Sequence, residues 1–273
     1  MKLELKSLVK RISISLSMAL ALALFLSGLE AKMFGYPALY GPFLPGKAPK
    51  SFRLNTCASV GEDLSQLGDI NGTVQQYRIR ADGQRQGQIT LTLHGTTNGW
   101  IFVISDSQGK SLMPAPFTNS MTSSLMEVFS GDLNQDGTPD FIVNVWSGGT
   151  GLAMDGSEVT FLLSSKDGYR ASSFYQYAFG KEDVVRFNAH GPVYFIHNQL
   201  IGNDGEKTRD GHDHKFWVYN LNRIDGSRFI PDDADQPGFP KWVWFTNQAN
   251  HDETIQLSKA QKDRLLIKRN SAK

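Results

Sequence analysis

Several features that mark common protein classes are missing from this chain of 273 residues. Cys57 is its only cysteine, so no disulfide can form within the chain, and we expect a buried, inert thiol. The charges nearly cancel, with 28 Lys and Arg against 27 Asp and Glu, so the basic excess of a nucleic-acid-binding protein is absent. The chain also lacks a Gly-x-Ser-x-Gly nucleophile motif and a His-Glu-x-x-His zinc motif. These absences argue against a nucleic-acid partner and against an enzyme.

Long hydrophobic runs are also scarce. The apolar stretch at residues 12–26 is shorter than the about 20 residues that a membrane-spanning helix needs. Basic residues precede this stretch, and the small residues Ser27, Gly28 and Ala31 lie in the segment that follows it. This layout predicts a secretory signal peptide over residues 1–31 and a periplasmic or secreted mature protein with no membrane span. An uncleaved N-terminal anchor is the alternative.

What the chain does contain is a recurring pattern of short β-branched and aromatic segments, separated by turn pairs such as Asp167-Gly168 and Asp225-Gly226. Hydrophobic residues make up 40% of the chain and aromatic residues 11%, enough for a folded core. In the segment 100–104 every residue is apolar, so we expect both faces of that strand to be covered. The predicted strands are residues 73–80, 88–94, 100–105, 124–129, 141–146, 158–164, 169–174, 184–187, 193–198, 215–222, 227–230 and 242–246.

This pattern predicts an all-β fold, an antiparallel meander that is either propeller-blade-like or a sandwich. Only the C-terminal end has a helical pattern, with Ser258 as the N-cap of a short C-terminal helix. We divide the mature chain into an extended arm (32–50), an N-terminal β unit (51–116) and a β domain (117–273) that includes this helix.

One segment between two predicted strands carries the strongest chemical signal. Residues 132–140 read Asp-Leu-Asn-Gln-Asp-Gly-Thr-Pro-Asp, with oxygen-bearing side chains at alternate positions and a glycine at the turn. Calcium takes six to eight oxygen ligands, and a loop with this spacing can wrap one ion. A polar hairpin loop without an ion is the alternative. The predicted calcium ligands are Asp132, Asn134, Asp136, the main-chain carbonyl of Thr138, and Asp140.

The segment around this loop is similar to a known repeat. Gly131-Asp132 leads into the loop, Pro139-Asp140-Phe141-Ile142-Val143 follows it, and Lys166-Asp167-Gly168-Tyr169 comes later. Residues 129–169 therefore resemble one FG-GAP or VCBS-type repeat, a family that builds β-propeller blades in integrin-like and secreted bacterial proteins. The resemblance implies that calcium lies between the outer strands of a blade. It also implies the same five ligand positions.

A second candidate metal site involves histidines. His212 and His214 lie two positions apart in a polar loop, so on an extended chain they would face the same side and could bind zinc or copper. Asp210 and His251 are candidates for a third ligand. The alternative is a solvated turn.

Two function classes follow from these observations. The first, which we favour, is an exported, non-catalytic β protein that calcium stabilises and that binds a protein or a glycan. Trp242 and Trp244 share one face of a predicted strand and could stack on sugar rings, or else fill the core. The second is an exported hydrolase or metal-dependent enzyme on the same scaffold, with the His212/His214 loop at its centre.

Overall fold

The described part of the chain is built almost entirely of antiparallel β-strands. The computed structural model describes residues 49–60, 70–81, 87–147, 156–177, 179–201, 216–232, 242–245 and 254–256. Among these residues the only helical element is the three-residue 3₁₀ turn η3 (Lys181–Asp183). None of the described helices is long and apolar enough to cross a membrane. The all-β prediction is confirmed. The predicted C-terminal helix and signal peptide lie outside the described residues.

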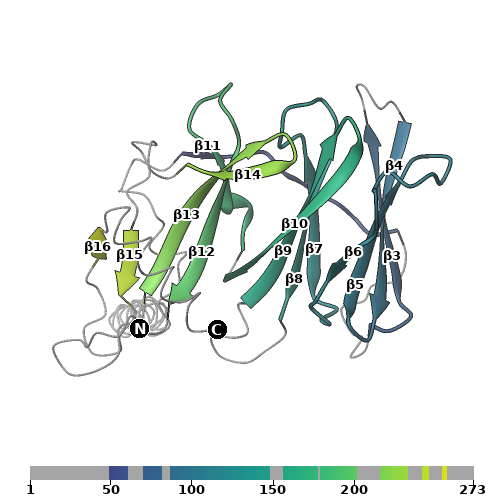
Figure 1. The fold of residues 1–273 in the computed structure, drawn as a ribbon, viewed down its shortest axis with the longest axis horizontal. Coiled ribbons are helices and arrows are strands. Elements are labelled where there is room, and N and C mark those ends of the chain that lie inside the picture. Colours follow the sequence, from purple (N-terminus) through teal and green to yellow (C-terminus); the bar gives the residue numbers. More distant parts are fainter. Residues whose placement is uncertain are drawn as a thin grey trace, which may run out of the picture.

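The strands form three sheets that stand side by side in Figure 1. The first sheet contains β3 (Val74–Ala81), β4 (Gly87–Thr96), β5 (Gly99–Ser105) and β6 (Phe117–Asn119). The middle sheet contains β7 (Met126–Gly131), β8 (Asp140–Trp146), β9 (Gly156–Ser165) and β10 (Gly168–Tyr177), with β2 (Asn55–Thr56) paired to β7. The third sheet contains β11 (Val184–Arg186), β12 (Tyr194–Ile201), β13 (Phe216–Asp225), β14 (Arg228–Pro231), β15 (Trp242–Phe245) and β16 (Thr254–Gln256), with β1 (Lys50–Ser51) paired to β11.

Consecutive strands pair as tight hairpins, because glycines supply the backbone conformations that the turns need. In the β9–β10 hairpin the register runs from Gly168 opposite Ser165 to Tyr177 opposite Gly156. Gly168 has a φ of +119°, and a Cβ atom there would lie 2.3 Å from the carbonyl oxygen of Leu112. Only glycine fits this turn against its neighbour.

Two hydrophobic cores join the sheets, and β8 contributes to both. Phe141, Val143 and Val145 face the core shared with the first sheet. Ile142, on the opposite face of the strand, packs into the core shared with the third sheet, which includes Phe195. This arrangement explains why β8 is apolar at nearly every position, and it confirms the prediction of a buried strand after the acidic loop.

The prediction that β5 is covered on both faces is wrong. Trp100, Phe102 and Ile104 are fully buried, but Ile101 and Val103 on the other face are only partly buried. The reason is position: the first sheet stands at one end of the stack (Figure 1), so no other described sheet covers its outer face. A continuous apolar run therefore does not establish how many faces of a strand are covered.

A single extended segment, residues 50–60, crosses all three sheets, and we call it the crossing segment. It pairs with β11 and with β7, and its Ser59 forms an isolated bridge to Tyr77 of β3. If the crossing segment is left out, each of these partner strands, β11, β7 and β3, comes first in its own sheet along the chain. The strands of the first sheet span residues 74–119, whereas the crossing segment belongs to no single sheet.

Candidate metal centre

The acidic loop connects β7 to β8 and is anchored at both ends. Leu133 is fully buried in the core between the middle and third sheets. The Tyr169 hydroxyl donates a hydrogen bond to the carbonyl oxygen of Pro139 at 2.7 Å. At the tip, Gln135 has a φ of +63°, and its side-chain amide donates to the carbonyl oxygen of Gly191 at 3.2 Å. The loop is therefore tied to both the middle and the third sheet.

Side-chain oxygens of the predicted ligands shape the loop from within. Asp132 Oδ2 accepts the N–H of Gly137 at 3.2 Å. Asn134 Oδ1 accepts the N–H of Asp136 at 3.1 Å, and Asp136 Oδ1 accepts the N–H of Thr138 at 2.7 Å. Each bond turns the backbone back toward the side chain that precedes it. The alternating residues thus share the inner side of the loop.

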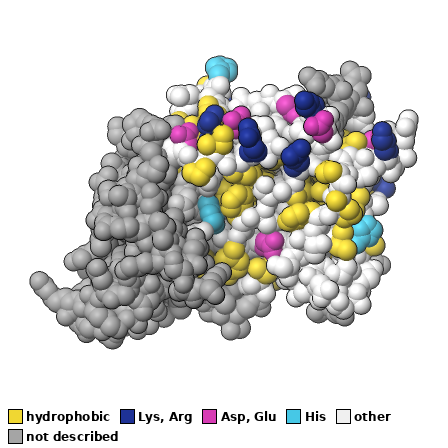
Figure 2. All heavy atoms as spheres, viewed as in Figure 1, with side chains coloured by type: hydrophobic (Ala, Val, Ile, Leu, Met, Phe, Trp, Pro, Cys, Tyr) yellow, Lys and Arg dark blue, Asp and Glu magenta, His cyan; other side chains and the backbone are white. Residues whose placement is uncertain are grey.

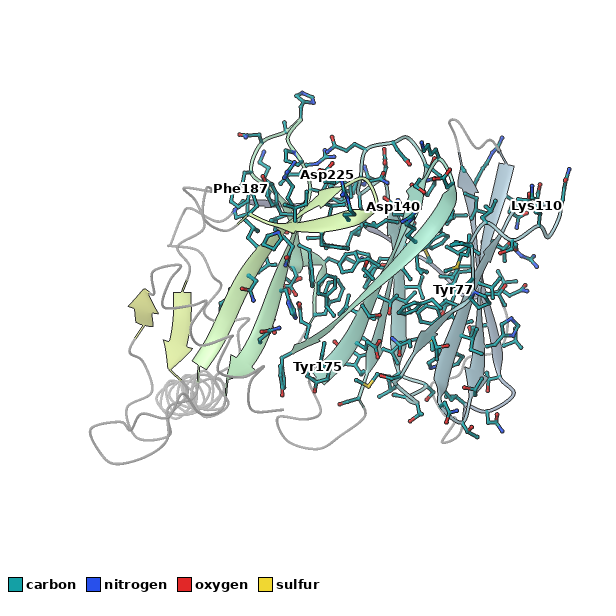
Figure 3. The ribbon with its side chains drawn as sticks, viewed as in Figure 1. Tyr77, Lys110, Asp140, Tyr175, Phe187 and Asp225 are labelled. Atoms are coloured by element: carbon teal, nitrogen blue, oxygen red, sulfur yellow. The ribbon has the colours of Figure 1, made fainter. Side chains whose placement is uncertain are left out.

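Asp140 braces the base of the loop (Figure 3). Its Oδ2 accepts the N–H groups of Leu133 at 2.7 Å and Asn134 at 3.2 Å, and its Oδ1 accepts the N–H of Ser164 at 2.6 Å. Burial raises the pKa of the Asp140 carboxyl to about 7, and these backbone hydrogen bonds oppose the rise. A carboxylate has about four acceptor sites, so the three N–H groups leave Asp140 little capacity for another ligand.

Ser164 of β9 is a site residue that sequence reasoning missed. Asn134 Nδ2 donates to the carbonyl oxygen of Ser164 at 2.7 Å, and the Ser164 hydroxyl donates to Asp136 Oδ2 at 2.9 Å. The loop motif carries no signal for this contact, because Ser164 comes from a neighbouring strand.

The fit of the loop to a cation depends on Asp132. Its Oδ1 is buried and has no hydrogen-bond partner within the described part of the chain. A buried carboxylate oxygen without a partner is costly unless a positive charge or a donor reaches it, so this oxygen fits a cation. The described residues contain no group of three His, Cys, Asp or Glu side chains arranged to hold a metal. A calcium site would therefore depend on the amide oxygen of Asn134 and the carbonyl oxygen of Thr138 as well.

The histidines predicted for a second metal site lie outside the described residues, and a further histidine lies on β12. His212, His214 and His251 lie outside the described residues, as does Asp210. His197 on β12 is buried, and its Nε2–H donates to the carbonyl oxygen of Tyr175 at 2.8 Å.

The bond from His197 has a structural role. β10 is an edge strand of the middle sheet, and side chains of the third sheet satisfy the outward-facing backbone at its end. Next to His197, the Asn198 side chain accepts the N–H of Tyr177 at 3.0 Å and donates to its carbonyl oxygen at 2.9 Å. These contacts protect part of an exposed strand edge from pairing with another chain.

Of the other residues that the sequence singled out, Cys57 shows no feature of a reactive thiol. Cys57 is half-buried, and burial raises the pKa of its thiol, which keeps it in the unreactive protonated form. Trp242 and Trp244 lie on β15, but the positions of their side chains fall outside what the structure describes.

A second buried carboxyl group, which the sequence did not reveal, lies in η3. Asp183 Oδ2 accepts the N–H of Gly180 at 3.0 Å and the side-chain amide of Gln176 at 2.7 Å. The residue as a whole is half-buried, but the carboxyl group points toward the fully buried Gln176. Burial raises the pKa of Asp183 to about 8, and the nearby Glu182 adds to the rise.

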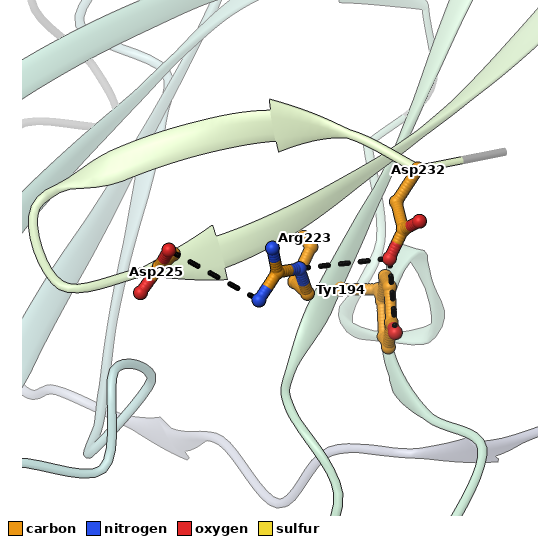
Figure 4. A network of polar contacts seen from close by, with 4 residues as sticks. All are labelled: Tyr194, Arg223, Asp225 and Asp232. Carbon is orange, nitrogen blue, oxygen red and sulfur yellow. Dashed lines mark hydrogen bonds and ion pairs between the residues drawn. The ribbon is translucent and has the colours of Figure 1, made fainter.

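The charged residues nearer the surface form weaker contacts. On the β13–β14 hairpin, Arg223 Nε lies 3.6 Å from Asp232 Oδ2, and the Tyr194 hydroxyl donates to the same oxygen at 3.3 Å (Figure 4). Asp225 lies 4.0 Å from Arg223. Figure 2 shows basic and acidic side chains interspersed along the upper rim of the visible face. Such exposed pairs contribute little to stability, and they offer no paired catalytic carboxylates.

Comparisons with protein-family models, with curated protein sequences and with solved structures found no match. The resemblance to an FG-GAP or VCBS-type repeat therefore stays a prediction. It rests on the acidic loop and on the strand that follows.

Proposed function

We propose that this protein is an exported, non-catalytic β protein that binds calcium in the β7–β8 loop and presents its stack of sheets to a protein or glycan partner. The buried, unpartnered Oδ1 of Asp132 carries the calcium part of this proposal. The export part is supported by the N-terminal sequence, and calcium outside the cell can saturate sites of modest affinity. The alternative enzyme function depends on the His212/His214 loop, and no described residue supports it.

Calcium would be held by the oxygens that line the loop. The residues that would hold it are Asp132, Asn134, Asp136 and the carbonyl group of Thr138, with Asp140 at the base of the loop contributing through the acceptor site that its three N–H partners leave. The ion would supply positive charge among three carboxylates that otherwise repel one another. The loop begins where β7 ends and closes where β8 begins. An ordered loop would therefore stabilise β8, the strand that contributes to both hydrophobic cores.

The test is thermal unfolding with and without calcium. Binding to the folded state alone raises the free energy of unfolding by about 2.7 kcal/mol at a hundredfold excess over Kd. We expect calcium to raise the melting temperature of the wild type, and Asp132→Ala to abolish the rise. Asp225→Ala, on the exposed hairpin, is the matched control and should keep the full response. A wild-type melting curve that calcium leaves unchanged would show that the loop is only a turn.

Export has its own test. Protein isolated from its native host should begin close to Lys32 and be recovered from the periplasm or the medium. N-terminal sequencing measures this directly. Intact Met1 in a washed membrane fraction would instead support the uncleaved anchor.

A further inference from the structure

Among the described strands, β10 is the longest that lies at the edge of a sheet. Its 10 residues pair with β9 on one side in an unbroken register from Gly168 to Tyr177. In an antiparallel pair, the N–H and C=O groups of successive residues point alternately toward the partner strand and away from it. Every second residue of β10 therefore turns its backbone outward, where another strand could pair with it.

Contacts at the two ends of β10 identify the residues that point outward. The N–H of Tyr169 donates to the carbonyl oxygen of Leu112 at 2.7 Å. At the other end, side chains of β12 bond to the outward backbone of Tyr175 and Tyr177. The outward set is therefore the odd-numbered residues, and chain packed beside β10 satisfies this set at both ends of the strand.

Between these ends lies a stretch that we call the open edge, residues 170–174. Its outward backbone groups belong to Ala171 and Ser173, and within the described part of the chain no group bonds to them. The residues of the open edge are exposed or half-buried, and Tyr175 beside it is exposed as well (Figure 3). Two donors and two acceptors that alternate along an extended strand are complementary to a second extended backbone.

The side chains of the open edge indicate what that second strand carries. Arg170 and Phe174 point to the same face of the sheet, because alternate side chains of a strand share a face. Arg170 is exposed and forms no ion pair with another described residue. The ring centre of Phe174 lies 4.8 Å from that of Phe229 and 5.1 Å from that of Phe195, yet Phe174 is only partly covered. Cross-strand pairing favours an acidic side chain opposite Arg170 and an apolar one opposite Phe174.

We propose that the open edge, residues 170–174, binds a short extended segment of a partner protein as an added antiparallel strand. Ala171 and Ser173 each exchange both backbone hydrogen bonds with this segment. The pairing is confined to the open edge, because other parts of the chain occupy β10 on either side of it. The segment carries an apolar residue opposite Phe174 and an acidic residue opposite Arg170. This assignment rests on the function proposed above, and it names the partner as a peptide segment and not a glycan.

The probe is the end-blocked peptide Leu-Thr-Ser-Thr-Glu, titrated into the full-length protein in the presence of calcium and followed by NMR of the backbone amides. In the antiparallel register, its Leu lies opposite Phe174 and its Glu opposite Arg170. We expect the amides of Ala171 and Ser173 to shift and to exchange more slowly with solvent. Methylating the amide nitrogens of both Thr residues removes the donors that face β10, and should weaken binding about tenfold or more. Methylating the central Ser nitrogen, which points away from β10, should change the affinity much less.

Two protein variants supply matched controls. Ala171→Pro removes an N–H that points outward, while the bonds between β10 and β9 stay, and it should weaken binding of the probe about fivefold or more. Arg170→Glu should weaken binding of the probe about fivefold, and a peptide that ends in Lys instead of Glu should recover the affinity in this variant.

Equal binding of the two methylated peptides overturns the proposal, because the contact would then not use the backbone of β10. A probe that leaves the Ala171 and Ser173 amides unchanged also overturns it. So does protection of these amides that rises with protein concentration in the absence of peptide, since a second copy of the chain would then occupy the edge.

The calcium response of the melting temperature, measured on the same sample, keeps the two proposals apart. A protein that responds to calcium but does not bind the probe overturns only the strand addition. A protein that binds the probe without a calcium response overturns only the calcium site.

Discussion

Asp140 and Asp183 are both buried carboxyl groups, but the protein surrounds them differently. Asp140 accepts three backbone N–H groups from the loop and from β9. Asp183 accepts one backbone N–H and one side-chain amide, and Glu182 lies beside it. Burial raises the pKa of both carboxyl groups, to about 7 for Asp140 and to about 8 for Asp183, where Glu182 adds to the rise. Both lie above the ordinary value, because burial disfavours the charged form.

The difference shows how one residue type serves two purposes. The donors around Asp140 converge on its oxygens, so removing the side chain would leave several buried N–H groups without acceptors. Asp140 therefore organises a loop that suits a cation. Asp183 has fewer donors and no cation among the groups that shift its pKa, so its site suits an acid that stays neutral.

The largest expected effect comes from Asp140→Ala. The change leaves the N–H groups of Leu133, Asn134 and Ser164 without their acceptor, and each buried unpaired donor costs about 1–3 kcal/mol. Because water can reach part of the opened site, we expect a total loss of about 3–5 kcal/mol in urea unfolding. Asp225→Ala should cost almost nothing. Equal losses in the two variants would contradict the bracing role of Asp140.

The pH dependence of stability separates the two carboxyl groups. Each has a folded-state pKa above its ordinary value of 3.8, so the folded state binds the proton more tightly. The free energy of unfolding should therefore fall as the pH rises from about 4, by up to about 1.4 kcal/mol per pH unit for each group. The contribution of Asp140 should level off near pH 7 and that of Asp183 near pH 8.

Asp183→Asn makes this separation measurable by chemical denaturation across the pH range. Between pH 7 and pH 8 the wild type should keep losing stability, whereas the variant should not. Parallel curves for the two proteins in this interval would show that Asp183 does not titrate there.

A smaller effect is expected at Asn144, which extends the comparison to a buried polar group with no hydrogen bonds. Neither its amide nitrogen nor its oxygen has a partner among the described residues, and the side chain is fully buried. Asn144→Leu keeps a similar volume and removes the unpaired polar atoms, so we expect stability in urea to rise by about 1 kcal/mol. Thr160→Val, at a buried hydroxyl bonded to Asn119 and Ser173, should instead be destabilising. A loss at Asn144 would show that its amide has a partner.

Local patterns predicted most of the strands. All twelve predicted strands are present, because β-branched runs between Asp-Gly turns specify extended hairpins. The strands β1, β2, β6 and β16 were not predicted, since two or three residues form no recognisable period. Their pairing is set by distant partners, such as Arg186 for Lys50.

The site was predictable only where its residues are adjacent in the sequence. The loop motif identified Asp132, Asn134, Asp136 and Asp140 as one group, and most of their backbone hydrogen bonds lie within that loop. Ser164 and Asp183 gave no such signal, because their roles depend on strands that come together only in the folded protein. Burial, and not residue type, distinguishes Asp183 from an ordinary surface aspartate.

The crossing segment implies an order of folding. Hairpins such as β9–β10 join neighbouring residues and can form quickly, whereas the pairing of Lys50 with Arg186 must close a long loop of chain. During synthesis, Ser59 can meet Tyr77 early, but β1 must wait until β11 has emerged. Residues 50–51 therefore dock only after the strands of the first two sheets and β11 have been made, and in an exported chain they would leave the membrane before their partner strand does.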